Sequence, residues 1–111
     1  PGREALIHIP EMSRQALAMF DDAMTSFTTL DAALAQRVLQ RDDEVDALNR
    51  EMISSIVRLI KADQAAIEGN LELARISRNL ERVADLATNI AEEVIFYTQA
   101  KFVKHHAADG Q

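Results

Sequence analysis

Residues 79–96 have the sequence NLERVADLATNIAEEVIF, in which apolar residues recur every three or four positions. This period is typical of an amphipathic helix, and no glycine or proline interrupts it. On a helical wheel that extends back to residue 73, the apolar residues gather on one side: Leu73, Ile76, Leu80, Ala87, Ile90, Ala91 and Val94. We therefore predict a helix over about residues 71–101 that packs through this side.

A second apolar stripe precedes it near the start of the chain. Its members are Met12, Ala16, Phe20, Ala23, Met24 and Phe27. We expect these residues to form the core face of a helix that runs to about residue 26, with Pro10 in its first turn. Both prolines lie within residues 1–10, and residues 1–9 are expected to form an irregular lead-in or linker. Thr29 and Asp31 are candidates to cap the next helix.

The middle of the chain predicts a long helix over about residues 31–60, with Leu34, Val38, Val45, Met52, Ile56 and Leu59 on one face. At about 1.5 Å per residue it is roughly 45 Å long, which suits an elongated bundle. Asp63 is a cap candidate at the following break, and residues 105–111 are expected to fray. Short connections make neighbouring helices antiparallel. The sequence therefore predicts an all-α fold: an up-down-up, spectrin-like three-helix bundle over residues 10–104.

The composition of the chain limits the classes of function that it can have. The formal net charge is −6 and the basic residues are scattered, so nucleic acid is not an expected partner. The chain has no cysteine, which excludes disulfides and thiolate metal sites. No apolar run approaches the roughly 18 residues that span a bilayer, so we expect a cytoplasmic protein without direct membrane insertion.

The acidic residues of the last helix form a line of their own. Glu81, Asp85 and Glu92 lie close together on the wheel, with Asn89 beside them, and all four lie away from the apolar side. Considered alone, such a line is typical of a solvated helix face.

The acidic residues of the middle helix are placed differently, because Asp42, Asp46 and Asn49 interrupt the apolar seam. A partly buried carboxylate costs free energy unless it is paired or binds a cation. One interpretation is a polar position that fixes helix register or pairs with an arginine. The other is a metal ligand.

The two acidic pairs are predicted to lie level. If the chain turns near Asp63, each residue before the turn lies opposite the residue equally far after it. Asp42 and Asp46 then face Glu81 and Asp85, and four such carboxylates repel one another unless cations or arginines neutralise them. Arg78 and Arg82 are available for an ion-pair cluster, and hard or borderline cations are the alternative.

Catalytic patterns are missing from the sequence. A ferritin-like di-iron enzyme needs Glu-x-x-His on two helices, whereas the only histidines are His8, His105 and His106 at the chain ends. The terminal pair is expected to belong to a solvated tail. There is no glycine-rich phosphate loop and no arrangement of Ser, His and Asp that suits a triad. We therefore predict a protein that is not an enzyme, with a carboxylate-metal hydrolase or oxidase as the weakest of the hypotheses.

Three segments resemble a known family. RDDEVDALNREM, ISRNLERVADLATNIAEEVIF and KFVKHH are similar to PhoU proteins, bacterial regulators of phosphate uptake, and most closely to the C-terminal of their two tandem three-helix repeats. The most specific part is residues 80–92, with the pattern Leu-Glu-Arg-x-x-Asp-x-x-x-Asn-Ile-x-Glu. The resemblance implies metal binding, iron or zinc and multinuclear in some members, through two E(D)xxxD motifs per repeat. These motifs fall on Asp42 with Asp46 and on Glu81 with Asp85, and Asn89 and Glu92 follow as additional candidates.

The resemblance also implies a function. PhoU proteins act as adaptors between the ATPase of a phosphate ABC transporter and a sensor histidine kinase, and they repress the phosphate-starvation response. Such a regulator works in the cytoplasm, where its partners recruit it to the inner face of the membrane. Since a PhoU protein is about twice this length, we expect one repeat of a longer protein or a one-repeat relative, packed against a second repeat or a second copy. The alternatives are a structural or oligomerisation bundle without metal, and an accessory domain of another type of phosphate transporter.

Overall fold

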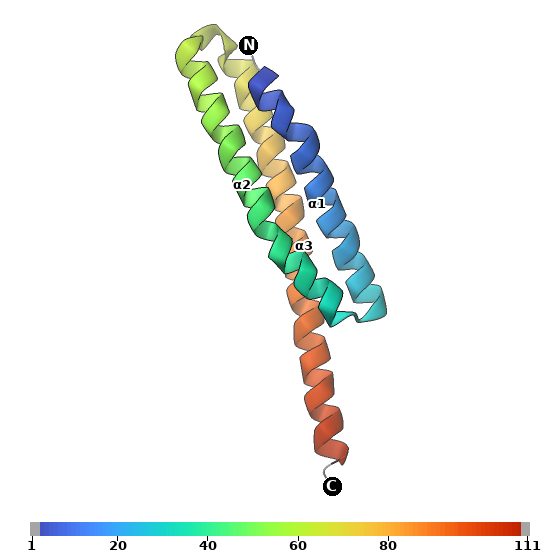
Figure 1. Cartoon of the computed structure of the whole chain (residues 1–111). Helices are drawn as coiled ribbons and strands as arrows, with labels where there is room; N and C mark the ends of the chain where they lie inside the picture. Colours follow the sequence, from blue (N-terminus) through green and yellow to red (C-terminus); the bar gives the residue numbers. More distant parts are fainter. Residues whose placement is uncertain (1–2, 110–111) are drawn as a thin grey trace.

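The computed structural model describes the backbone of residues 3–109 and the side chains of residues 8–65 and 67–104. Its elements are α1 (Arg3–Thr29), α2 (Ala32–Ala62), the short 3₁₀ helix η1 (Gln64–Ala66) and α3 (Ile67–Asp109). Figure 1 shows α1, α2 and α3 side by side, with the chain running down along α1, up along α2 and down again along α3. The predicted all-α, antiparallel three-helix bundle is confirmed.

The bundle is a narrow rod of 71 × 17 × 17 Å. Its core is built largely from small side chains, since Ala16, Ala23, Ala35, Ala84, Ala87 and Ala91 are all buried. Small residues let helix axes approach closely, which explains the thin cross-section. The larger members of this cluster are Met12, Met19, Val38, Val45 and Val94. None of the helices in the described part of the chain is long and apolar enough to cross a membrane.

The start of α1 differs from the sequence prediction. Residues 3–9 were expected to be irregular, but they are helical, and Pro10 lies inside the helix instead of in its first turn. Residues 1 and 2 lie outside the described residues. Proline lacks the N–H that would bond to the carbonyl of Leu6, which weakens the helix at this point. Ile9 compensates because it packs against the second apolar cluster, around Met52 and Ile56.

The end of α1 also lies beyond its predicted position. The helix continues to Thr29, and Leu30 takes a left-handed conformation with φ 53°. The N–H of Asp31 donates to the carbonyl of Ser26 at 2.9 Å, which completes a Schellman motif. Asp31 is the N-cap of α2, as predicted, and its Oδ1 accepts from the N–H of Leu34 at 3.0 Å.

The apolar stripe of α1 is only partly core. Met12, Ala16 and Ala23 are buried as predicted, whereas Met24 and Phe27 are exposed. Met19, which the stripe omitted, is fully buried. The predicted core face was therefore wrong at Met24, Phe27 and Met19. Because α1 packs against both α2 and α3, the side of α1 that is buried is the one that faces the seam between these two helices.

The last helix is longer at both ends than the sequence predicted. Asp63 caps the turn, and its Oδ1 accepts from the N–H of Ala65 at 3.0 Å. The chain then re-enters helix at Ile67 and continues to Asp109, so residues 105–109, for which the sequence predicts fraying, have a helical backbone. Residues 110 and 111 lie outside the described residues. No glycine or proline occurs between Gly69 and Gly110, so nothing in this stretch breaks the helix.

Candidate functional site

The candidate site lies on one side of the bundle, where α2 and α3 run antiparallel. Asn49 and Ser77, which are equally far from Asp63 along the chain, are in direct contact: the Ser77 hydroxyl donates to Asn49 Oδ1 at 2.5 Å. The other end of the same amide, Nδ2, donates to Glu81 Oε2 at 3.0 Å. The structure therefore has the register predicted from a turn near Asp63, and Asn49 links the acidic parts of the two helices.

Asp42 is the central carboxylate of this face. Burial raises the pKa of Asp42 above its ordinary value, and the charges of Asp46, Asp85, Asp43 and Glu81 raise it further. The structure thus brings Asp42 and Asp46 of α2 within electrostatic reach of Glu81 and Asp85 of α3. Oδ1 of Asp42 is buried and accepts no hydrogen bond. A buried oxygen without a donor is costly, and a cation would offset that cost.

The carboxylates do not converge on one point. Among the described side chains, no three His, Cys, Asp or Glu groups are close enough together to hold a metal ion as they stand. Asp85, Asn89 and Glu92 are exposed, whereas Asp42, Asp46 and Glu81 are half-buried. The donor set has the oxygen chemistry that hard cations require, and coordination needs rotation of exposed side chains such as Asp85.

Ser77 was missed by the sequence analysis. Its side chain is fully buried, and its hydroxyl also lies 3.4 Å from Sδ of Met12 on α1. Because the hydroxyl has one proton and the contact to Asn49 is much shorter, we assign that proton to Asn49 Oδ1. In the sequence, Ser77 is only a small polar residue one turn before Glu81. Its role can be recognised only when the structure places Asn49 opposite it.

The neighbouring arginines do not neutralise the carboxylates of this face. Within the described residues, neither Arg78 nor Arg82 forms an ion pair with any of the four motif carboxylates. Arg41 adjoins Asp42 in the sequence, but its Nη1 lies 2.7 Å from Oδ2 of Asp22 on α1. The ion-pair cluster considered from the sequence is therefore not formed, and the repulsion around Asp42 remains.

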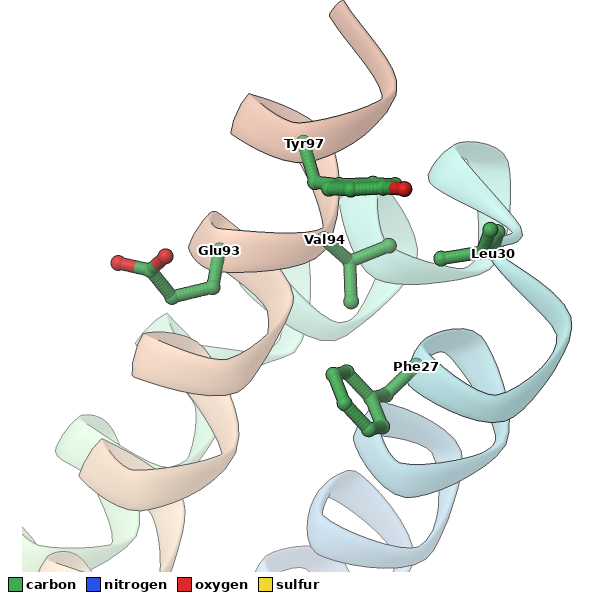
Figure 2. Close-up of a pocket in the computed structure, with 5 residues that line it drawn as sticks. All are labelled: Phe27, Leu30, Glu93, Val94 and Tyr97. Atoms are coloured by element: carbon green, nitrogen blue, oxygen red, sulfur yellow. The ribbon is translucent and has the colours of Figure 1, made fainter. Parts of the chain in front are cut away.

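A separate apolar pocket of about 320 Å³ lies at the α1–α2 turn, where α3 leaves the bundle. Figure 2 shows Tyr97, Val94, Leu30 and Phe27 around this hollow, with the carboxylate of Glu93 turned away from them. The pocket therefore offers apolar surface without an inward-pointing reactive group, and it is not the candidate site.

The fold and the site together define the class of this protein. It is a three-helix bundle that carries paired E(D)xxxD carboxylates on two facing helices. Comparison with known proteins identifies the family within this class. The family model for the PhoU domain matches residues 9–94, and the chain belongs to the PhoU family. The resemblance seen in the sequence is confirmed.

Curated relatives agree with this assignment. The chain is 33% identical to a "phosphate-specific transport system accessory protein PhoU homolog 1" of Thermotoga maritima, over 91% of this chain and 44% of the relative. It is 32% identical to the PhoU homolog of Pseudomonas aeruginosa, over 89% of this chain and 41% of the relative. For Escherichia coli PhoU the identity is 23%, over 94% and 43%. The chain thus spans less than half the length of these relatives, and no solved structure matches it significantly.

Proposed function

We propose that this chain is a regulatory domain of a phosphate uptake system. The observation that carries the proposal is the PhoU domain match over residues 9–94, with relatives that are named accessory proteins of phosphate-specific transport. Its role is regulatory and not enzymatic. It acts in the cytoplasm as an adaptor between the transporter ATPase and a sensor histidine kinase, and these partners recruit it to the inner face of the membrane.

We further propose that the acidic face binds metal ions, with iron or zinc as the expected metal. Asp42 and Asp46 from α2 and Glu81 and Asp85 from α3 are the proposed ligands, and Asn89 and Glu92 are additional candidates on α3. The unpartnered, buried Oδ1 of Asp42 and the raised pKa of this group support the proposal. Bound cations would supply positive charge between two helices that otherwise repel through their carboxylates.

The metal part is tested by measuring the metal content of protein purified without chelator and then incubated with Fe²⁺ or Zn²⁺. The wild-type chain should retain metal after gel filtration, and the double variant Asp42→Ala with Asp85→Ala should not. A matched control replaces Asp21 and Glu68, two exposed acids outside the acidic face, with alanine. Equal metal content in the two double variants, or none in the wild type, would contradict the proposal.

The adaptor part needs a separate experiment. The transporter ATPase and the sensor kinase should each be retained by the immobilised protein in a pull-down, and the control variant at Asp21 and Glu68 should retain them equally. If neither partner binds, the adaptor part is wrong whatever the metal content.

A second candidate is a structural or oligomerisation bundle without metal, including an accessory domain of another phosphate transporter. It is favoured by one observation: no three potential ligands of the described residues converge. In that case, neutralising Asp42, Asp46, Glu81 and Asp85 together should stabilise the fold or leave it unchanged, and partner binding should not respond.

A further inference from the structure

The part of α3 that leaves the bundle carries a stripe of four exposed residues. Figure 1 shows this part running past the α1–α2 turn without another helix beside it. The residues of the stripe are Glu93, Tyr97, Ala100 and Lys104, at intervals of four, three and four positions. That spacing places them on one side of the helix, and it is the spacing of the seam in a coiled coil. The stripe therefore suits contact with another helix.

Two hollows lie along the stripe and share Tyr97. The first is the apolar pocket at the α1–α2 turn, to which Glu93 and Tyr97 contribute. The second has a volume of about 420 Å³ and is lined by Tyr97, Ala100, Lys101 and Lys104. Figure 2 shows the carboxylate of Glu93 turned away from the first hollow, so this charge stays accessible from outside. A helix that packs along the stripe would cover both hollows.

The charges at the two ends of the stripe are opposite. Residues 92 and 93 are both glutamates, whereas residues 94–104 contain Lys101 and Lys104 and no acid. Within the described residues, neither Glu93 nor Lys104 forms an ion pair. The two groups are about 16 Å apart along the helix, so they do not pair with each other. An antiparallel helix of the same sequence would pair both charges, whereas a parallel one would bring like charges together.

The stripe is complementary to itself when its direction is reversed. If two copies of α3 lie antiparallel, with a two-fold axis between residues 98 and 99, Glu93 of each copy faces Lys104 of the other. In the same register, Tyr97 of each copy faces Ala100 of the other, so a large ring meets a small side chain. An interface with two-fold symmetry uses the same patch on both copies and requires this kind of self-complementarity.

We propose that the stripe is the interface of a homodimer, in which a second copy of this chain packs its α3 antiparallel along it. Each Lys104 forms an ion pair with Glu93 of the other copy, and each Tyr97 ring enters the second hollow of the other copy, above Ala100. The contact supplies a neighbour to the protruding part of α3, because an isolated helix this short is marginal in water. The proposal is independent of the metal site and of the adaptor role, because it uses none of their residues.

The proposal is tested by analytical ultracentrifugation of the chain at concentrations from about 1 μM to about 500 μM. We expect a reversible equilibrium between monomer and dimer with a dissociation constant of about 10–100 μM, because a contact of three helical turns is smaller than a standard interface. Glu93→Lys and Lys104→Glu each bring like charges together twice in the dimer, so each should weaken it about tenfold or more. The matched control is Glu68→Lys, since Glu68 is likewise an exposed glutamate of α3 but lies outside the stripe.

An equimolar mixture of the two variants tests the antiparallel register. Glu93→Lys leaves two basic ends on the stripe and Lys104→Glu leaves two acidic ends, so the mixture should form a heterodimer although each variant alone is weakened. The chain with both changes should dimerise again, because both ion pairs are restored with reversed direction.

Three results would overturn the proposal. They are a mixture without a heterodimer, a control that weakens the dimer as much as Lys104→Glu does, and a wild-type chain that stays monomeric, which would assign the stripe to a different partner. Glu93, Lys104 and Glu68 are all exposed, so their replacement leaves the core unchanged, and circular dichroism checks that each variant is folded.

Discussion

Asp42 is an aspartate whose charge opposes folding when no cation is present. Its raised pKa means that the folded chain holds this proton more tightly than the unfolded chain, so the group's contribution to stability is lost as the pH rises through the raised value. Asp42→Asn removes the charge and should stabilise the metal-free protein at pH 7 by a few tenths of a kcal/mol to about 1 kcal/mol. The gain should shrink as the pH falls through the raised pKa of Asp42 and vanish below about pH 3, where Asp42 is protonated in both states. Urea unfolding of both proteins at pH 7 and about pH 3, in the presence of chelator, measures it.

The control for this experiment is Asp21→Asn, which neutralises an exposed aspartate of α1. It should change the free energy of unfolding by less than Asp42→Asn at pH 7. If Asp42→Asn instead destabilises the protein at pH 7, the charged Asp42 carboxylate must form a favourable interaction that is not seen in the structure.

Asn49 organises the acidic face through hydrogen bonds to both Ser77 and Glu81. Asn49→Ala removes both bonds and leaves the buried Ser77 hydroxyl with only the weak sulfur acceptor of Met12. We expect a loss of about 1–2 kcal/mol in the free energy of unfolding. The matched control is Asn79→Ala, which truncates an exposed asparagine of α3. Urea denaturation compares the two variants, and equal midpoints would disprove the role of Asn49.

At the scale of the elements, helix interiors were more predictable than helix ends. The apolar period placed Val38, Val45 and Met52 correctly in the core, because burial in a bundle follows the wheel. The ends depend on competition between local breakers and tertiary contacts. Pro10 was expected to start a helix, yet the packing of Ile9 carries α1 past it. A leucine in a left-handed conformation, Leu30, closes α1 where the usual signal would be glycine.

Gly69 is a weak point in the first turns of α3. A Cβ atom built on Gly69 would meet nothing within 4 Å, so alanine fits there without a clash. Gly69→Ala should raise the free energy of unfolding by about 0.5–1 kcal/mol, because alanine has the higher helix propensity and restricts the unfolded chain. Thermal unfolding followed by circular dichroism measures this gain. A lower melting temperature would mean that the α2–α3 turn needs the flexibility of glycine.

At the scale of the whole molecule, the sequence could predict that two acidic pairs face each other, because an antiparallel hairpin fixes which residues are level. It could not predict the contact between Asn49 and Ser77, since hydrogen bonds depend on side-chain positions that only the packed helices define. Nor did the periodicity identify the apolar pocket beside Tyr97, because it assigned Phe27, which lines that pocket, to the core. Local patterns thus give the bundle and its register, whereas sites between helices require the assembled fold.

The packing around α3 differs along its length, because only part of this helix lies against α1 and α2. Figure 1 shows α3 continuing past the α1–α2 turn without a helix beside it. Phe96, Phe102 and Val103 are accordingly 60–70% exposed, whereas Ala87 and Val94 are buried among three helices. An isolated helix shorter than about 12–15 residues is marginal in water, so the protruding part should open far more readily than the bundle.

Native-state hydrogen exchange of the isolated chain tests this difference in support. Amides near Ala87 and Val94 should exchange only with global unfolding, whereas those of residues 100–104 should open with a free energy of about 0–1 kcal/mol. The measurement should be made at two protein concentrations, because a second copy that covers Phe102 and Val103 would slow exchange there as concentration rises. Uniform protection along α3 that does not change with concentration would contradict the expectation, since it would require the protruding helix to be stable without a neighbour.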